Sequence, residues 1–367
     1  MQRRSFLAAS GALTLATAAG FNANAIMPVS NPLLLPWTGP YGGLPPFDKV
    51  KVADFKPAIE EGMAWNLAEI DRIANNPEPA TFENTIAAME GAGRPLGRAM
   101  AIYGIWKSTM NLPDMQAVAT EMEPKLSAFN DQIIQNEKLF HRIEAVYNSP
   151  AKAKLTPEQQ RLVWVDYTDF VRAGAKLNAA QKARLSEINQ KLAGLYTTFS
   201  QNLQADEDQI TLIDNEADLA GVTPSLRDSF AQAAEEKGHK GKWAVVNTRS
   251  SMDPFLTYAQ NRSLREKVWR TYYSRCDNND AHDNKVLIGQ VLTLRAERAK
   301  LLGYPTHAHW RVENVMAKTP DNAMDLMMKV WPAAVARVHE EVADMQAVAD
   351  KEGAGIRIAP WDYRFYA

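Results

Sequence analysis

The chain has 367 residues, of which 46% are hydrophobic and 23% are charged, values typical of a globular protein with a substantial core. This composition excludes an intrinsically disordered or collagen-like protein, and the length allows one large domain or two medium ones. Lys and Arg number 41 against 43 Asp and Glu, a formal net charge of -2. No excess of positive charge therefore favours binding to nucleic acid or to an anionic membrane.

The N-terminus is typical of a signal peptide. The sequence RRSFL from Arg3 to Leu7 fits a twin-arginine n-region, and the stretch after it is too short and too weakly apolar to span a bilayer. Residues 23–25, ANA, fit an A-x-A cleavage site. We expect a twin-arginine signal peptide over residues 1–25, export to the periplasm and no stable membrane span. An N-terminus that stays attached is the alternative.

Cleavage after residue 25 would leave 39 basic and 43 acidic residues, so the mature protein is expected to be mildly acidic. The periplasm permits disulfides, but Cys276 is the single cysteine of the sequence. No internal disulfide can form, and stability has to come from packing.

Helical patterns begin soon after the signal peptide. Apolar residues at helical spacing predict a helix over residues 54–73, and a second helix is expected from Thr81 to Gly91. The glycines from Gly91 to Gly97 resemble a dinucleotide-binding loop superficially. No strand is predicted before them, Pro95 lies among them and their spacing is wrong, so we expect a helix break there.

The clearest pattern in the chain runs from residue 178 to residue 203. Apolar side chains recur there at intervals of three and four and predict one long helix with a single buried stripe. The residues of this stripe are Leu185, Ile188, Leu192, Leu195, Phe199 and Leu203. We interpret the stripe as core and not as a cofactor site.

Three more long helices are predicted further along the chain, at residues 262–275, 283–302 and 320–351. Two short segments, 243–247 and 356–358, are expected to be strands. The fold class is therefore mainly α with a minor β element.

The domain division follows from these patterns. A Pro-rich N-terminal lead over residues 26–48 follows the signal peptide, and residues 49–367 form one continuous helical region. We find no internal repeat, low-complexity tract or long linker in the sequence.

The segment RVHEEVADM, from Arg337 to Met345, begins like a zinc-peptidase motif. H-E-x-x-H places two histidines four residues apart on one helical face, with a glutamate as general base. Position 343 is alanine, so His339 has no partner, and one imidazole cannot hold zinc. We interpret this segment as a charged helix surface.

The remaining candidate motifs are equally incomplete. His307 and His309 are two residues apart, and side chains at that spacing diverge on a helix. The acidic run from Cys276 to Asp280 lacks the glycine and the glutamate of a calcium loop. The sequence has no G-x-S-x-G, Walker A or C-x-x-C motif. These motifs alone do not predict a function.

A family resemblance supplies more information. Six segments, in order along the chain, resemble the thimet oligopeptidase family of zinc metallopeptidases. The first segment is most similar to the peptidyl-dipeptidase (dipeptidyl carboxypeptidase) branch of that family. These segments are LLLPWTGPYGGLPPFDKVKVADFKPAIEEGM at 33–63, TFENTIAAME at 81–90, FSQNL at 199–203, PFLTYAQNRSLREKVWRTYYSR at 254–275, LRAERAKLLGY at 294–304 and ENVMAKTPDNAMDLM at 313–327.

The resemblance implies an elongated helical body with a deep channel that admits short unfolded peptides. It also implies a zinc ion held by H-E-x-x-H and a later glutamate. In the family this motif follows a W-D-x-x-x-Y segment, which here is residues 361–366, and the sequence has no H-E-x-x-H. We therefore assign no catalytic and no metal residue, leave the substrate-binding residues open, and expect no zinc bound by this chain alone.

Two readings of the function remain open. In the first, the chain is the N-terminal portion of an exported zinc metallopeptidase that releases C-terminal dipeptides, forms one wall of the channel and is inactive alone. It would arise as a truncated gene product or as half of a split enzyme with a complementary C-terminal piece. In the second, it is a non-catalytic helical module that binds peptides or a partner. The first reading predicts an uncovered apolar helix face near the C-terminus, and the second predicts a polar one.

Overall fold

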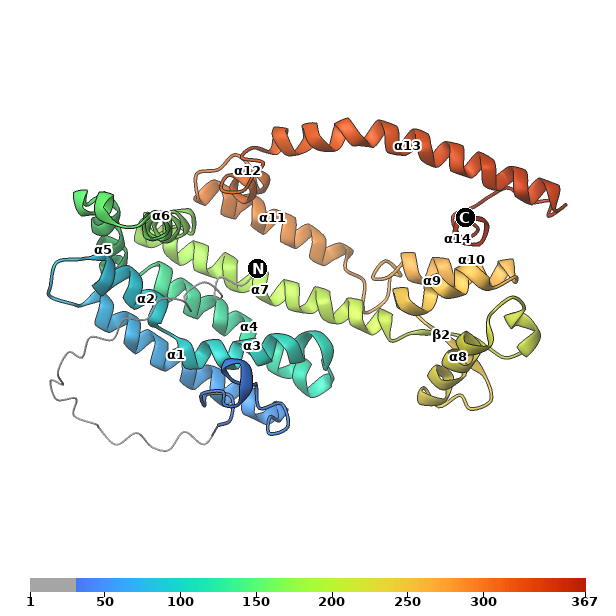
Figure 1. Cartoon of the computed structure of the whole chain (residues 1–367), viewed down its shortest axis with the longest axis horizontal. Coiled ribbons are helices and arrows are strands. Elements are labelled where there is room, and N and C mark those ends of the chain that lie inside the picture. Colours follow the sequence, from blue (N-terminus) through green and yellow to red (C-terminus); the bar gives the residue numbers. More distant parts are fainter. Residues whose placement is uncertain (1–30) are drawn as a thin grey trace.

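The computed structural model describes residues 31–367 (Figure 1). The proposed signal peptide and the first residues of the Pro-rich lead lie outside this range. The first half of the described chain contains α1 (Val52–Ala74), the π-helical turn η2 (Phe82–Ala87), α2 (Ala88–Gly91), α3 (Arg94–Thr109), α4 (Pro113–Ile134), α5 (Glu137–Asn148), α6 (Pro157–Arg172) and α7 (Ala179–Glu207), with short 3-10 turns at Pro40–Gly42 and Pro150–Lys154.

The second half contains β1 (Ile210–Ile213), a 3-10 turn at Glu216–Leu219, α8 (Pro224–Glu236), β2 (Trp243–Val246), α9 (Arg249–Tyr258), α10 (Arg262–Tyr273), α11 (Lys285–Leu301), α12 (His307–Val312), α13 (Pro320–Lys351) and α14 (Tyr363–Tyr366). The prediction of a mainly α fold with a minor β element is confirmed. Within the described residues, no helix is long and apolar enough to cross a membrane.

The N-terminal bundle packs α1 against α3 and α4 around one apolar core. Phe55 of α1 lies edge-on to Tyr103 and Trp106 of α3, with ring centroids 6.0 and 5.4 Å apart. Leu33 and Leu34, from the Pro-rich lead, are 0% and 2% exposed in this core. The end of the lead is therefore part of the folded bundle.

The predicted helix break between α2 and α3 is present. Gly93 has φ of 69° and caps α3, and its N–H donates to a carboxylate oxygen of Glu69 at 2.6 Å. A Cβ at Gly93 would lie 2.8 Å from Nδ2 of Asn66. Glycine is needed at this position for backbone conformation and for space.

Helix α7 runs through the middle of the molecule and packs against α4 and α11 (Figure 1). Asn178 and Gln181 form a capping box at its N-terminus, which explains why the helix begins there. Leu185, Ile188 and Leu192 are buried as predicted. The prediction that Phe199 is buried is wrong, because its side chain is 36% exposed.

A small β element joins α8, α9 and α10 beyond the end of α7. Strands β1 and β2 pair antiparallel, with Ile210 opposite Val246 and Ile213 opposite Trp243. The strand predicted at residues 243–247 is confirmed, whereas β1 was not predicted. Its four residues alternate between half-buried and buried positions, a run too short to stand out in the sequence.

The C-terminal segment returns to α10 after α13. The strand predicted at residues 356–358 is wrong, because the backbone of this segment bonds to the side chains of Gln346 and Arg262 and not to a neighbouring strand. Gln346 Nε2 donates to the Ile356 carbonyl at 2.8 Å, and Gln346 Oε1 accepts from the Ile358 N–H at 2.9 Å. Asp362 then pairs with Arg262 and Arg265 of α10, each at 2.8 Å.

Candidate functional site

The paired histidines of the sequence lie at the start of α12. Nδ1 of His309 hydrogen-bonds to Oγ1 of Thr306 at 2.8 Å. His307 lies beside Trp310, with ring centroids 5.5 Å apart, and burial together with the charges of nearby arginines lowers its pKa. Within residues 31–367, no group of three or more His, Cys, Asp or Glu side chains is arranged to hold a metal ion.

The structure also places His339 and the acidic run from Cys276 to Asp280. His339 is exposed on α13, where Arg337 pairs with Glu340 at 3.2 Å. In the loop from Cys276 to Asp280, the Cys276 N–H donates to the buried Asp206 carboxylate at 2.6 Å. The side-chain oxygens of Asp277 and Asn279 in this loop accept hydrogen bonds from Nζ of Lys285 at 2.6 and 2.9 Å, so they are bound to an ammonium group of the chain itself. Among the described residues, neither His339 nor this loop belongs to a group of side chains arranged to hold a metal ion.

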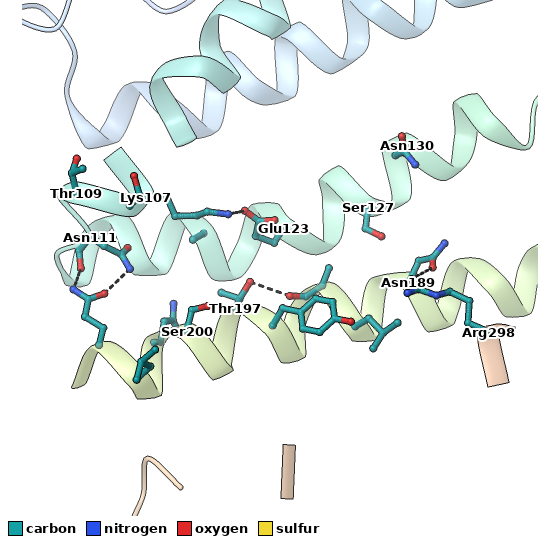
Figure 2. A pocket seen from close by; sticks show the side chains of 18 of the residues that line it. Lys107, Thr109, Asn111, Glu123, Ser127, Asn130, Asn189, Thr197, Ser200 and Arg298 are labelled. Atoms are coloured by element: carbon teal, nitrogen blue, oxygen red, sulfur yellow. Dashed lines mark hydrogen bonds and ion pairs between the residues drawn. The ribbon is translucent and has the colours of Figure 1, made fainter. Parts of the chain in front are cut away.

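A groove of about 920 Å³ runs along one face of α4 and α7 and is the main cavity candidate (Figure 2). Neutral polar side chains line it together with apolar and charged ones. From α4 they include Ser127 and Asn130, and from α7 they include Asn189, Thr197, Ser200 and Gln204. We call this the α4–α7 groove.

The two walls are linked at one end of the groove. Asn111, in the connection between α3 and α4, donates from Nδ2 to Oε1 of Gln204 at 2.6 Å, and Gln204 Nε2 donates back to the Asn111 carbonyl at 2.9 Å. Gln201 Nε2 donates to the carbonyl of Gln116 at 3.1 Å. These bonds hold α4 and α7 at a fixed separation.

At the opposite end, Asn189 bridges the buried Asp131 and the half-buried Arg298. Its Nδ2 donates to Oδ1 of Asp131 at 2.9 Å, and its Oδ1 accepts from Nη1 of Arg298 at 3.2 Å (Figure 2). Burial raises the pKa of Asp131, against the opposing effects of hydrogen bonds from Ser186 and Asn189. Burial also lowers the pKa of Arg298. Asp131 is 5% exposed.

A second, more apolar groove lies on the other side of α7, where α7 faces α11. Gly194 and Thr198 of α7 and Gly289 and Thr293 of α11 line it. Two residues of one helix, Thr198 and Ser200, therefore face different cavities.

Helix α13 carries a long uncovered surface. It lies along the edge of the molecule between α12 and α14 (Figure 1). Its buried residues, Met345 and Ala349, are both near its C-terminal end. From Met324 to Glu340 every side chain except Val335 is exposed. This stretch includes Leu326, Met327, Met328, Val330 and Trp331, which are 53–65% exposed.

The comparisons with known proteins agree with this architecture. The model of peptidase family M3 matches residues 255–367. The chain is 36% identical to the dipeptidyl carboxypeptidase of Escherichia coli (strain K12), over 93% of this chain and 50% of that protein. It is 34% identical to the dipeptidyl carboxypeptidase of Salmonella typhimurium, over 92% and 50%, and 31% identical to oligopeptidase A of Haemophilus influenzae, over 93% and 50%.

These matches, with the helical fold, show that the chain belongs to peptidase family M3, the thimet oligopeptidase family. Within that family it is similar to the dipeptidyl carboxypeptidase branch, so the resemblance inferred from the sequence is confirmed. The chain spans about half the length of the curated relatives it matches.

The sequence predictions did not identify the α4–α7 groove. A pattern was nevertheless present, because Asn189, Thr197, Ser200 and Gln204 recur at helical spacing on the face of α7 beside its leucine stripe. Polar residues at this spacing usually mark a solvated helix face. Only the position of α4 shows that they face a groove.

Proposed function

We propose that these 367 residues form the peptide-binding, non-catalytic half of a zinc metallopeptidase that releases C-terminal dipeptides from oligopeptides. In this proposal, a second half that this sequence does not contain supplies the zinc ligands and the general base. That half is on the same polypeptide or on a complementary C-terminal piece. Short unfolded peptides are the substrates, and the chain is inactive alone.

The main support for this proposal is the uncovered apolar surface of α13. Between Leu326 and Val338 the charged residues are Lys329 and Arg337, so the helix is apolar around most of its circumference. Such a helix is normally buried inside a larger structure. The aligned relatives are about twice as long as the region that they share with this chain. Both observations support a second half that covers α13.

The alternative is a non-catalytic helical module that binds peptides or a partner on its own. A module selected to function alone would present a polar surface on α13, because a large exposed apolar patch promotes aggregation. Exposed side chains such as Met327 and Trp331 therefore favour the first reading.

Zinc content and dipeptide release test the division into halves. Purified residues 26–367, incubated with zinc and dialysed, are expected to keep less than one equivalent of zinc and to release no C-terminal dipeptide from a short peptide. Single substitutions of His307, His309 and His339 by Ala are expected to change neither result. One equivalent of tightly bound zinc with chelator-sensitive dipeptide release would contradict the proposal.

We also propose that residues 1–25 direct export to the periplasm by the twin-arginine route. The support is the sequence RRSFL at residues 3–7 and the ANA site at 23–25. Replacing Arg3 and Arg4 by Lys keeps the charge but removes the paired guanidinium groups. The variant is expected to stay in the cytoplasm, as measured by cell fractionation. Periplasmic accumulation equal to that of the wild type would contradict this route.

A further inference from the structure

Three arginines gather where α11 meets α12. Arg298 of α11 lies over the ring of Trp310, with its guanidinium carbon 4.7 Å from the ring centroid, and the guanidinium carbon of Arg311 lies 5.7 Å from the same centroid. Arg295, also on α11, donates from Nε to the Tyr196 hydroxyl of α7 at 2.8 Å. We call Arg295, Arg298 and Arg311 the arginine cluster. Its side chains come from two helices and contact a third.

The three guanidinium groups lie close enough to affect one another. Burial lowers the pKa of Arg298, and the charges of Arg295 and Arg311 lower it further. Burial also lowers the pKa of His307, and all three arginines add to this effect. Like charges held this close repel one another, so the cluster favours a bound anion that offsets them.

Within residues 31–367, no carboxylate forms an ion pair with the arginine cluster. The acidic side chains nearest to it in sequence are paired elsewhere. Glu297 of α11 pairs with Arg184 at 2.6 Å. Glu313, which follows α12, pairs with Arg172. Guanidinium groups gathered without a carboxylate suit an oxyanion, because each presents its N–H donors in a planar fork.

Donor groups of the cluster remain available to a ligand. Nη1 of Arg298 donates to Asn189, but its buried Nε has no hydrogen-bond partner within the described chain. Nδ1 of His307 is likewise buried without a partner there. Asp131 offsets part of the charge of Arg298, but Asn189 lies between the two side chains (Figure 2). A buried donor without an acceptor is costly, and an anion that accepts from it would relieve this cost.

We propose that the arginine cluster binds an inorganic oxyanion of the phosphate class. Phosphate carries a charge of roughly -1.5 near pH 7, and its several acceptor oxygens suit donors that come from two helices. Guanidinium groups already lie over the rings of Tyr196 and Trp310, so these rings offer no free platform for a nucleotide base. Arg298 lines the α4–α7 groove and Arg311 is exposed, so a small ion reaches the cluster from solvent.

Inorganic phosphate is the probe for this site. Isothermal titration calorimetry of the full chain at pH 7, in about 150 mM sodium chloride, is expected to give one phosphate per chain with a Kd of about 1 mM or lower. Arg295→Gln and Arg311→Gln each remove one charge and should weaken binding about tenfold. Arg337→Gln is the matched control, because it removes an exposed arginine of α13 that pairs with carboxylates of its own helix. It should bind phosphate like the wild type.

Circular dichroism verifies that the variants fold, and the exposed Arg311 keeps the test valid even if Arg295→Gln does not fold. Phosphate should also raise the melting temperature of the wild type by a few degrees, and that of Arg311→Gln by less. Absence of saturable phosphate binding, or an equal loss in Arg337→Gln, would overturn the site. Equal binding of acetate at the same ionic strength would assign the cluster to carboxylates and overturn the phosphate class. The proposed function is tested separately, by the chimera described at the end of the Discussion.

Discussion

At the scale of single residues, Asp362 fixes the C-terminal segment to α10. Its side chain is 0% exposed and accepts hydrogen bonds from Arg262 and Arg265 and from the Ala359 N–H. Burial alone would raise the pKa of Asp362, but these hydrogen bonds outweigh it and the pKa is lowered. The neighbouring Trp361 lies edge-on to Trp269 of α10, with ring centroids 5.8 Å apart.

Removing this carboxylate is expected to destabilise the chain strongly. Asp362→Ala leaves Arg265, which is 2% exposed, without its charged partner and should cost about 3–5 kcal/mol at pH 7. Because the folded pKa is lowered, this contribution is present above the unfolded value of about 3.9 and is lost as the pH falls through the folded pKa. Urea unfolding at pH 7 and at acid pH measures both effects. Asp344→Ala on the exposed face of α13 is the control, and an equal effect of the two substitutions would contradict the assignment.

Asp131 is expected to show the opposite pH dependence. Burial raises its pKa, so the folded state loses stability as the pH rises from about 3.9 through the folded pKa. Asp131→Asn keeps an acceptor for Asn189 and carries no charge. The variant should be at least as stable as the wild type at pH 7, with the difference shrinking towards pH 4. Thermal melts of both proteins between pH 4 and pH 7 measure this difference in stability. An Asp131→Asn variant whose stability relative to the wild type falls as the pH rises from 4 to 7 would contradict this prediction.

At the scale of elements, α7 shows which sequence patterns determine packing. Leu192 is 1% exposed and clusters with Ile188 of α7 and Val291 of α11. Phe199 belongs to the same sequence stripe but is 36% exposed. A helical stripe therefore predicts which face is apolar, but the length over which a partner helix covers that face depends on tertiary structure.

This difference gives a matched pair of substitutions. Leu192→Asp places a carboxylate without a partner in the core and is expected to cost several kcal/mol. Phe199→Asp, on the same stripe, should cost much less because water reaches the side chain. Chemical unfolding of both variants measures the contrast. Equal stabilities of the two variants would show that the burial of Leu192 contributes little.

The short elements show why the sequence predicts the fold only partly. Thr81 and Asn178 are N-caps, and the capping side chain is a local pattern that sequence reasoning uses well. In contrast, Ile356 and Ile358 have the composition of a strand, yet Gln346 of α13 takes their backbone groups. The α4–α7 groove likewise depends on two helices that are distant in sequence, so no local pattern defines it.

At the scale of the whole molecule, α13 is the feature that a complete enzyme would have to cover. The chain alone is therefore expected to bind a hydrophobic dye such as anilinonaphthalene sulfonate. Replacing Met327 by Lys and Trp331 by Glu should reduce dye fluorescence without loss of stability, because these side chains are 54% and 63% exposed. Met316→Glu, at a residue 99% exposed before α13, should have little effect. Unchanged dye binding in the double variant would place the apolar surface elsewhere.

A chimera tests whether this chain can serve as the non-catalytic half of a dipeptidyl carboxypeptidase. The region of the Escherichia coli dipeptidyl carboxypeptidase that aligns with this chain, 50% of that protein, is replaced by the matching residues of this chain. We predict that the purified chimera binds zinc and releases C-terminal dipeptides from a short peptide, whereas this chain alone does neither. A folded, zinc-loaded chimera without dipeptide release, measured beside an active parent enzyme, would contradict the account.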